Sequence, residues 1–445
     1  MAFSPTDSTL FAPLFSDPNL ASIFSDAQFV AYLLQVEAAL AKVQGRLGVI
    51  PAEAVEPIVQ ATQTLTVDFD ALRVGIDQAG VPIIALLKQL RGEVGGEAAS
   101  YVHWGATTQD IMDTALVLQL QVALTLLEPV LSAVIHNLAR LADAHRQTVM
   151  AGRTRSQQAM PIPFGLKVAG WLAPLLRHRQ RLAELKPRLL VVQFGGAVGT
   201  LASLGEDGLA VQAALATELA LGTLPVPWHT QRDNLAELAG WLSLVSGSLA
   251  KIGQDIILMA QTEVGELRES SDISRGGSST MPQKSNPTIS GPIIAAARTN
   301  ASLLAAMHQA LGQEHERSTH GLEIEWLTLP QMVALTATAL HKAHFLSANV
   351  VVNSAQMQAN VAASNGLMLA EAVSFALAEH MPRVEAKALV TEAVAAVLAE
   401  GRHLVDVVRK KSQAPIDWEA LKDETKYFGS SNAFIDRILR EVDGL

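Results

Sequence analysis

Apolar residues recur every three to four positions along most of this chain, which is the spacing of one face of a helix. Between residues 235 and 267 the repeating apolar positions are Leu242, Val245, Leu249, Ile252, Ile256 and Met259. Such a seam is typical of long helices that pack nearly parallel in a bundle. Residues 116–144 and the segment after Pro287 are also apolar at nearly every turn. The pattern predicts an all-α protein with a central bundle of long helices.

Polar segments containing Gly or Pro divide this helical pattern into three parts. Ser25 is placed to cap the first long helix, and Asn365-Gly366 and Pro382 interrupt shorter helices near the C-terminus. The predicted domains are an N-terminal helical domain over residues 1–110, a central long-helix bundle over 111–354 and a small C-terminal helical domain over 355–445.

Composition narrows the class of protein. The chain has 445 residues, of which 49% are hydrophobic, and no Cys, so disulfides and thiol chemistry are excluded. Its net charge of −10 argues against a nucleic-acid surface, although a pocket can still be locally basic. No run of about 18 uninterrupted apolar residues and no signal peptide is visible, so we expect a cytoplasmic protein without a membrane span.

One polar segment, residues 270–287, separates two apolar helical stretches and is rich in Ser and Gly. A loop of this length in a compact domain is usually functional or disordered, so a mobile surface connector is the alternative. Ser278 and Ser279 supply hydroxyls and Lys284 a cation. Asn286 and Pro287 are predicted to cap and begin the next helix, whose free N–H groups would form an anion site beside Lys284.

Two further segments carry residue types that bind carboxylates. Thr107 and Thr108 follow a Gly-Ala turn at the start of a long helix, where hydroxyls and N–H groups can bind an anion, although a capping turn is equally consistent. Arg153 and Arg155 flank a threonine, and guanidinium groups bind carboxylates bidentately. The alternative for these arginines is a solvated pair at a helix end.

Three other features are weaker. The Gly-rich turn at residues 193–200 fits no nucleotide-binding spacing and indicates close backbone packing. His229 is more often structural than a proton donor in such a setting, and Arg232 beside it is a candidate for the site lining. Residues 313–318 form a charged cluster that we place on a helix, where alternation across its faces predicts no metal site.

The order Gly-Ser-Ser-Thr-Met-Pro-Gln-Lys-Ser-Asn-Pro over residues 277–287 resembles the signature loop of the fumarase/aspartase superfamily. Residues 103–110, 151–161 and 314–317 resemble further superfamily motifs. The resemblance implies that Ser278 is the catalytic base and that Lys284 acts beside it. It implies substrate-binding roles for His103, Thr107, Thr108, Arg153, Arg155, Gln157, Arg232, Ser279, Asn286 and Arg317. It also implies a homotetramer with active sites shared between subunits.

Three departures favour one branch of the superfamily. Arg155 occupies the position of the lyases' general-acid histidine, and Gly291 that of a glutamate five residues after the signature asparagine. Residues 81–87 are apolar where adenylosuccinate lyase has a His-Asp pair. With N-terminal similarities, these features resemble the carboxymuconate cycloisomerase branch, which implies a cofactor-independent lactonisation of a tricarboxylate in the β-ketoadipate pathway. The alternatives are a lyase that releases fumarate and a non-catalytic helical scaffold.

The chemistry of that branch requires stabilisation of an aci-carboxylate dianion by fixed positive charge. Lys284, the N-terminus of the following helix and Arg317 are the expected donors. Ser278 would exchange the proton, provided that loop N–H groups and Lys284 stabilise its alkoxide. A hinge at Gly276-Gly277 would let the loop close over the substrate.

Overall fold

The computed structural model describes residues 4–272 and 274–443, and these form two compact units. The first unit takes in the chain up to Pro129, His178–Ser246 and Ala296–Thr338, and the second takes in the remaining segments. Helices dominate both units, so the predicted all-α class is confirmed. The predicted boundaries near residues 110 and 355 stay a prediction.

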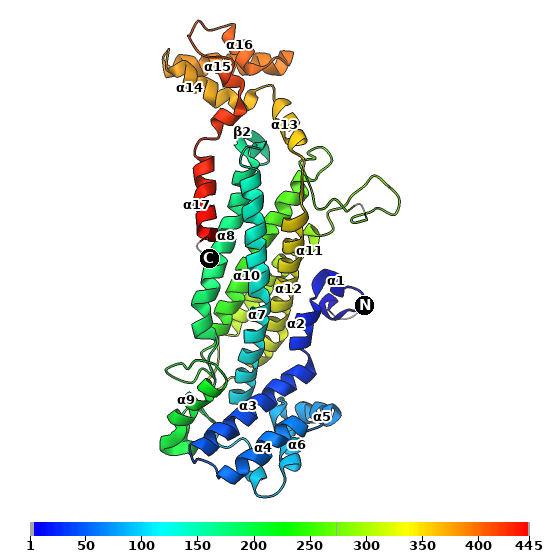
Figure 1. The fold of residues 1–445 in the computed structure, drawn as a ribbon, viewed down its shortest axis with the longest axis vertical. Coiled ribbons are helices and arrows are strands. Elements are labelled where there is room, and N and C mark those ends of the chain that lie inside the picture. Colours follow the sequence, from blue (N-terminus) through cyan, green and yellow to red (C-terminus); the bar gives the residue numbers. More distant parts are fainter. Residues whose placement is uncertain (1–3, 273, 444–445) are drawn as a thin grey trace. The chain divides into compact units, whose positions relative to one another are not determined.

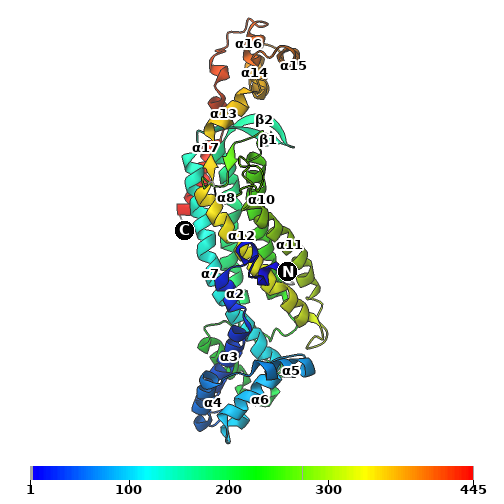
Figure 2. The same ribbon diagram turned by 90° about the vertical axis from the view of Figure 1, so that its right-hand side faces the viewer.

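Five long helices contribute residues to both units, and within each unit their segments lie side by side (Figure 1, Figure 2). Their bounds are α7 Thr108–Ala144, α8 Phe164–Leu189, α10 Asp233–Met259, α11 Ser290–Gln309 and α12 Gly321–Asn349. The seam predicted on α10 is confirmed, because every one of its six residues is at most 4% exposed within the single chain.

Shorter helices complete the first unit around an apolar core that includes Leu33, Leu40, Leu86 and Leu215. They are η1 Pro5–Asp7, α1 Ala12–Phe15, α2 Pro18–Ile23, α3 Asp26–Arg46, α4 Ala52–Thr64, α5 Phe69–Ala79, α6 Ile83–Val94, η2 Ala98–Tyr101, η3 Ala202–Asp207 and α9 Gly208–Glu218. Helix α3 begins as predicted, since the hydroxyl of Ser25 accepts a hydrogen bond from the N–H of Gln28 at 3.3 Å.

The second unit adds a group of short C-terminal helices with a separate apolar core around Val373, Val390 and Val405. They are α13 Ser354–Ala362, η4 Leu367–Leu369, α14 Ala370–Ala378, α15 Arg383–Glu400, α16 Leu404–Arg409, η5 Ala420–Lys422, η6 Glu424–Tyr427 and α17 Ser431–Asp443. Strands also occur here: β1 Val149–Thr154 pairs with β2 Gln157–Pro163, and β3 Leu267–Arg268 with β4 Val351–Val352, both antiparallel.

Two expectations about helices need correction. Helices α7 and α10 are long and apolar enough to span a membrane by length and composition, and a bent pair of segments, Ser354–Ala362 and Leu367–Ala378, passes the same test. Mean hydropathy finds these candidates although occasional polar residues interrupt every apolar run. Half of the most apolar window of α7 and of α10 is buried inside the chain. The charged residues 313–318 are also not helical, because they connect α11 to α12.

Candidate functional site

The first residues of α7 bring two predicted carboxylate-binding side chains together in the first unit. Arg317 donates from Nη1 to the hydroxyl of Thr107 at 2.6 Å and from Nε to Oε1 of Gln109 at 3.3 Å. The backbone N–H of Thr107 donates to Oδ2 of Asp110 at 3.0 Å. Asp110 thus supplies the acidic half of a capping box at the start of α7, while the hydroxyl of Thr107 accepts a hydrogen bond from Arg317.

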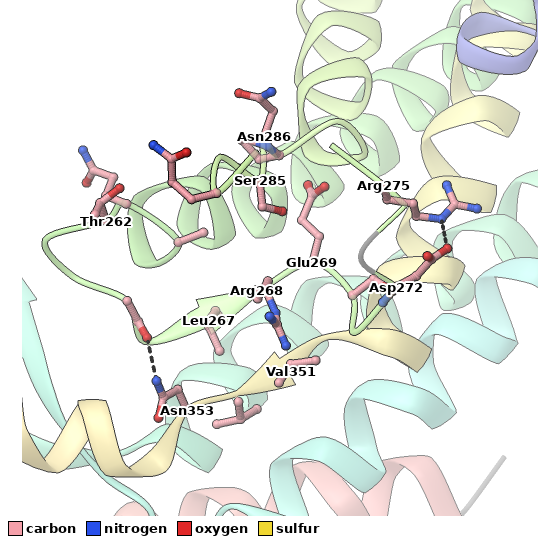
Figure 3. A pocket seen from close by; sticks show the side chains of 17 residues that line it. Thr262, Leu267, Arg268, Glu269, Asp272, Arg275, Ser285, Asn286, Val351 and Asn353 are labelled. Carbon is pink, nitrogen blue, oxygen red and sulfur yellow. Dashed lines mark hydrogen bonds and ion pairs between the residues drawn. The ribbon is translucent and has the colours of Figure 1, made fainter. Parts of the chain in front are cut away.

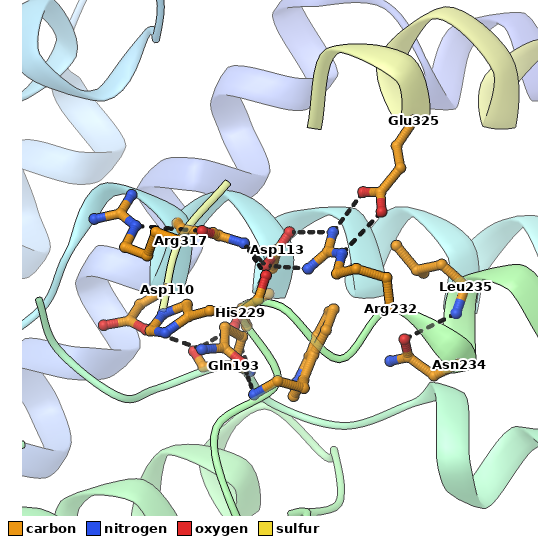
Figure 4. A network of polar contacts seen from close by, with 12 residues as sticks. Asp110, Asp113, Gln193, His229, Arg232, Asn234, Leu235, Arg317 and Glu325 are labelled. Atoms are coloured by element: carbon orange, nitrogen blue, oxygen red, sulfur yellow. Dashed lines mark hydrogen bonds and ion pairs between the residues drawn. The ribbon is translucent and has the colours of Figure 1, made fainter. Parts of the chain in front are cut away.

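Asp110 organises the surrounding loops, as Figure 4 shows. Its fully buried carboxylate accepts hydrogen bonds from the N–H groups of Gly195 and Gly196, both at 2.9 Å, and lies 2.8 Å from Nε2 of His229. Close packing of the Gly-rich turn is confirmed, since a Cβ on Gly195 would lie 2.7 Å from Pro227. The local sequence does not reveal these roles of Asp110, because Gly195, Gly196 and His229 all lie more than 80 residues away from it.

Arg232 lies in the same part of the first unit and is almost fully buried between two carboxylates (Figure 4). It donates to Asp113 at 2.6 and 2.9 Å and to Glu325 at 2.8 and 2.5 Å. Burial alone would lower the pKa of Arg232, but the two carboxylates outweigh burial and raise it. Burial raises the pKa of Glu325, and the negative charge of Asp113 also raises it, whereas the guanidinium of Arg232 acts in the opposite direction. Arg232 thus connects α7 to α12 through its hydrogen bonds to Asp113 and Glu325.

The remaining predicted residues of the first unit are His103 and Thr108. His103 precedes α7 in a left-handed backbone conformation with φ of 66°, and its Nδ1 lies 2.6 Å from Oε1 of Glu37. Thr108 is the first residue of α7 and is half-buried. Glu37 was not predicted, since it lies 66 residues before His103 within an apolar helix.

In the second unit, the predicted arginine pair lies on the β1–β2 hairpin, so the alternative of a helix end is wrong. Arg153 pairs bidentately with the buried Glu266 at 2.8 and 2.6 Å. Arg155 is exposed in the hairpin turn with φ of 47°, and Gln157 is exposed at the start of β2. Of the two arginines, Arg155 is therefore the solvent-exposed one.

The signature loop, also in the second unit, places two backbone donors on the predicted base. The Oγ of Ser278 accepts hydrogen bonds from the N–H groups of Met281 at 3.1 Å and Thr280 at 3.3 Å. Such donors would stabilise a serine alkoxide. Ser279 and Lys284 are exposed. Ile273 of this segment lies outside the described residues.

Asn286 closes the base of the loop and does not cap a helix, so that prediction is wrong. Its backbone N–H and its side-chain Nδ2 donate to the carbonyl of Gly276 at 2.8 and 2.9 Å. Gly276 has φ of 73°, and a Cβ there would collide with the backbone of Asn286, so the position requires glycine. The predicted hinge at Gly276 is thus tied to the far end of the loop in this structure.

Helix α11 begins at Ser290, and its N-terminus is already occupied by a carboxylate. Glu269 accepts from the N–H of Ile289 at 3.0 Å and of Ser290 at 2.7 Å. The expected anion site at this helix end is therefore filled by the protein itself. Glu269 lines a cavity of about 490 Å³. Arg268, Arg275, Ser285 and Asn286 also line it (Figure 3).

Replacing Glu269 by Ala should destabilise the protein by about 1–2 kcal/mol, since two N–H groups at the start of α11 lose their acceptor in a buried place. The loop should also become easier to cleave, because its two ends are no longer tied. Urea unfolding and limited proteolysis at residues 270–288 measure both effects. Exposed Glu263 has no comparable role, so Glu263→Ala should leave both measurements unchanged.

In the described part of the chain, no group of three or more His, Cys, Asp or Glu side chains could hold a metal ion. The cationic and hydroxyl groups of the two units instead suit an anionic organic substrate. Thr107, Arg232 and Arg317 belong to the first unit, whereas Arg155, Ser278, Lys284 and Asn286 belong to the second.

Comparisons with known proteins agree with this picture. A family model described as lyase matches residues 15–299, and one described as adenylosuccinate lyase C-terminus matches residues 366–438. The chain is 45% identical to a 3-carboxy-cis,cis-muconate cycloisomerase of Pseudomonas aeruginosa, over 98% of the chain and 97% of the relative. It is 40% identical to trans-aconitate decarboxylase 1 of Mycosarcoma maydis, over 96% of the chain and 87% of the relative. A crystal structure of 3-carboxy-cis,cis-muconate lactonizing enzyme from Pseudomonas putida matches with a TM-score of 0.93 at 42% identity, covering 98% of this chain and 99% of that one.

Proposed function

Since the chain belongs to the lyase family, we propose that it is a cofactor-independent cycloisomerase that interconverts 3-carboxy-cis,cis-muconate and 4-carboxymuconolactone. The nearly full-length similarity to a cycloisomerase of that specificity is the observation that carries the proposal. Arg155 and Gly291 support it, because they replace the histidine and glutamate of the fumarate-releasing lyases. We place the enzyme in the cytoplasm, in the protocatechuate branch of the β-ketoadipate pathway.

The residues fit the chemistry of lactonisation. A substrate carboxylate oxygen forms a bond to one carbon of the diene, a carbon–carbon π bond breaks, and a proton is added to the neighbouring carbon. The trianion and one proton thus give a lactone with two carboxylates. Negative charge accumulates on a carboxylate during the reaction, and Lys284 and Arg317 supply positive charge for it. Ser278, with two N–H donors at its Oγ, transfers the proton.

The test is the ultraviolet absorbance of 3-carboxy-cis,cis-muconate mixed with purified enzyme and no added cofactor. The proposal predicts loss of the conjugated-diene absorbance and formation of the lactone. Folded protein that leaves the absorbance unchanged would refute it. Adenylosuccinate and argininosuccinate, assayed for fumarate release, test the lyase alternative. The name of the Mycosarcoma maydis relative contains trans-aconitate, which is an unsaturated tricarboxylate like 3-carboxy-cis,cis-muconate. Trans-aconitate is therefore a suitable comparison substrate.

For the assembly we propose a homotetramer whose active sites are shared between subunits. Exposed apolar side chains remain on the long helices, among them Val122 and Leu126 on α7 and Leu244 and Leu258 on α10. Burial of such side chains in an interface is favourable. Light scattering on the size-exclusion peak measures the mass of the assembly, and a monomer would exclude this proposal.

Shared sites predict that two inactive variants can restore activity in mixed oligomers. Arg317→Ala and Ser278→Ala remove groups from different units of the chain. If each site draws these groups from different subunits, oligomers reassembled from both variants should contain some sites with neither substitution. Activity measured after joint unfolding and refolding should therefore recover in part. A mixture that stays as inactive as the two separate variants would contradict shared sites.

A further inference from the structure

A buried carboxylate holds one of the predicted substrate-binding groups. Nδ1 of His103 and Oε1 of Glu37 are 2.6 Å apart, and the side chain of Glu37 is only 1% exposed. Glu37 lies in the middle of α3, where its neighbours Val36, Leu40 and Ala41 belong to the apolar core. A carboxylate in such a place is costly unless it is paired. His103 is the one partner that the described residues offer to it.

His103 is held but still accessible. Its side chain is 11% exposed, and its Nε2 makes no hydrogen bond within residues 4–272 and 274–443. Its φ of 66° lies in the left-handed region, which non-glycine residues seldom adopt and which is often found at functional sites. Four residues further on, Thr107 pairs with Arg317, so the imidazole belongs to the segment that carries the predicted carboxylate-binding groups.

We propose that Glu37 is a positioning residue that acts through His103, fixing Nδ1 so that Nε2 donates a proton in a hydrogen bond to a carboxylate of the substrate. The hydrogen bond at one ring nitrogen determines what the other nitrogen can do. With Nδ1 bonded to Glu37, Nε2 is the ring nitrogen left for the substrate, and an imidazole ring placed between two carboxylates, that of Glu37 and that of the substrate, donates to both. This inference rests on the proposed function, because it assigns a contact to the same tricarboxylate substrate.

Glu37→Gln keeps the size of the side chain and removes its charge. We expect KM to rise about 10–100-fold with kcat changing little, since a carboxylate contact present in both ground and transition states affects binding. A purely structural role for Glu37 would lower the melting temperature without this selective rise in KM.

A double-mutant cycle tests whether Glu37 acts through the imidazole. His103→Asn is the suitable partner, because Asn tolerates a positive φ. In the His103→Asn background, Glu37→Gln should add no further rise in KM. The matched control is Gln44→Met, whose native side chain lies on the same helix and donates to the carbonyl of Trp104 at 2.7 Å. The effect of Gln44→Met should add to that of His103→Asn, because Gln44 contacts the backbone of Trp104 and not the imidazole of His103.

Binding of a saturated tricarboxylate, propane-1,2,3-tricarboxylate, is measured by calorimetry on the same variants and does not depend on turnover. Coupling between Glu37 and His103 in binding, together with wild-type enzyme that leaves carboxymuconate unchanged, would retain this inference and refute the proposed function. Additive effects in the cycle, or a folded Glu37→Gln variant with unaltered KM and binding, would overturn the inference. If Glu37→Gln does not fold, Glu37→Asp replaces it in the cycle, with the same two outcomes.

Discussion

Ser278→Ala should lower kcat by about 10²–10⁴-fold, the usual contribution of a group that transfers a proton in the transition state. The Oγ of Ser278 is the atom that receives the N–H groups of Thr280 and Met281, so its removal leaves that pair of donors without an acceptor. The loop is largely exposed, and the melting temperature should therefore change little. Steady-state rates on 3-carboxy-cis,cis-muconate and thermal unfolding measure the two quantities.

Ser274→Ala is the matched control, because Ser274 lies in the same loop and its hydroxyl donates to Asp272, two residues away. It should retain nearly normal turnover. Lys284→Ala should lose orders of magnitude in turnover as Ser278→Ala does, since its exposed ammonium is a cation of the same loop as the base and can stabilise developing negative charge. Near-normal turnover of folded Ser278→Ala would refute the role of Ser278 as the proton-transferring group.

Arg232→Met should destabilise the folded protein by about 3–5 kcal/mol, the cost of breaking a buried ion pair from one side. The substitution leaves Asp113 and Glu325 buried without their shared cation, which previously bonded to both. Denaturant unfolding followed by circular dichroism measures the loss. The fall in stability should be accompanied by looser packing between α7 and α12, which hydrogen exchange detects.

Two controls separate this effect from the loss of any arginine. Arg188→Met removes a salt bridge to Glu237 in which both side chains are 40% or more exposed, and should change stability by less than about 1 kcal/mol. Combining Arg232→Met with Asp113→Leu and Glu325→Leu removes all three buried charges and should restore much of the lost stability. Equal effects of Arg232→Met and Arg188→Met would contradict a buried triad.

Periodicity predicted the part of the fold that depends on local spacing. The seam on α10 is buried as expected, because a three-to-four repeat places its residues on one face. The β1–β2 hairpin was not predicted, because its strands have only six and seven residues and the helical patterns on either side of it are stronger. The start of α11 was also misplaced: Asn-Pro is a common helix start, but Asn286 bonds to Gly276 instead.

Motifs identified the candidate residues, but their partners come from distant parts of the chain. Thr107 and Arg317 were predicted separately from two motifs, and the structure pairs them. Asp110, Glu37 and Glu269 were missed as buried acceptors, because neither a single acidic residue in a helix nor one just after a short strand has a local signal of its distant donors. Each is recognised only when the fold brings its donors to it.

Glu269 has a consequence for how this enzyme family can be re-engineered. Glu269 lies just before the loop, and its carboxylate accepts hydrogen bonds from the N–H groups of Ile289 and Ser290, just after the loop. These hydrogen bonds hold the two ends of residues 270–288 together and involve no residue of the loop itself. A segment fixed at both ends can change in length at a small cost in closure entropy. Residues 270–288 are therefore a natural unit for transplantation, in which a loop from a relative is exchanged as a cassette while Glu269 and Ser290 are kept.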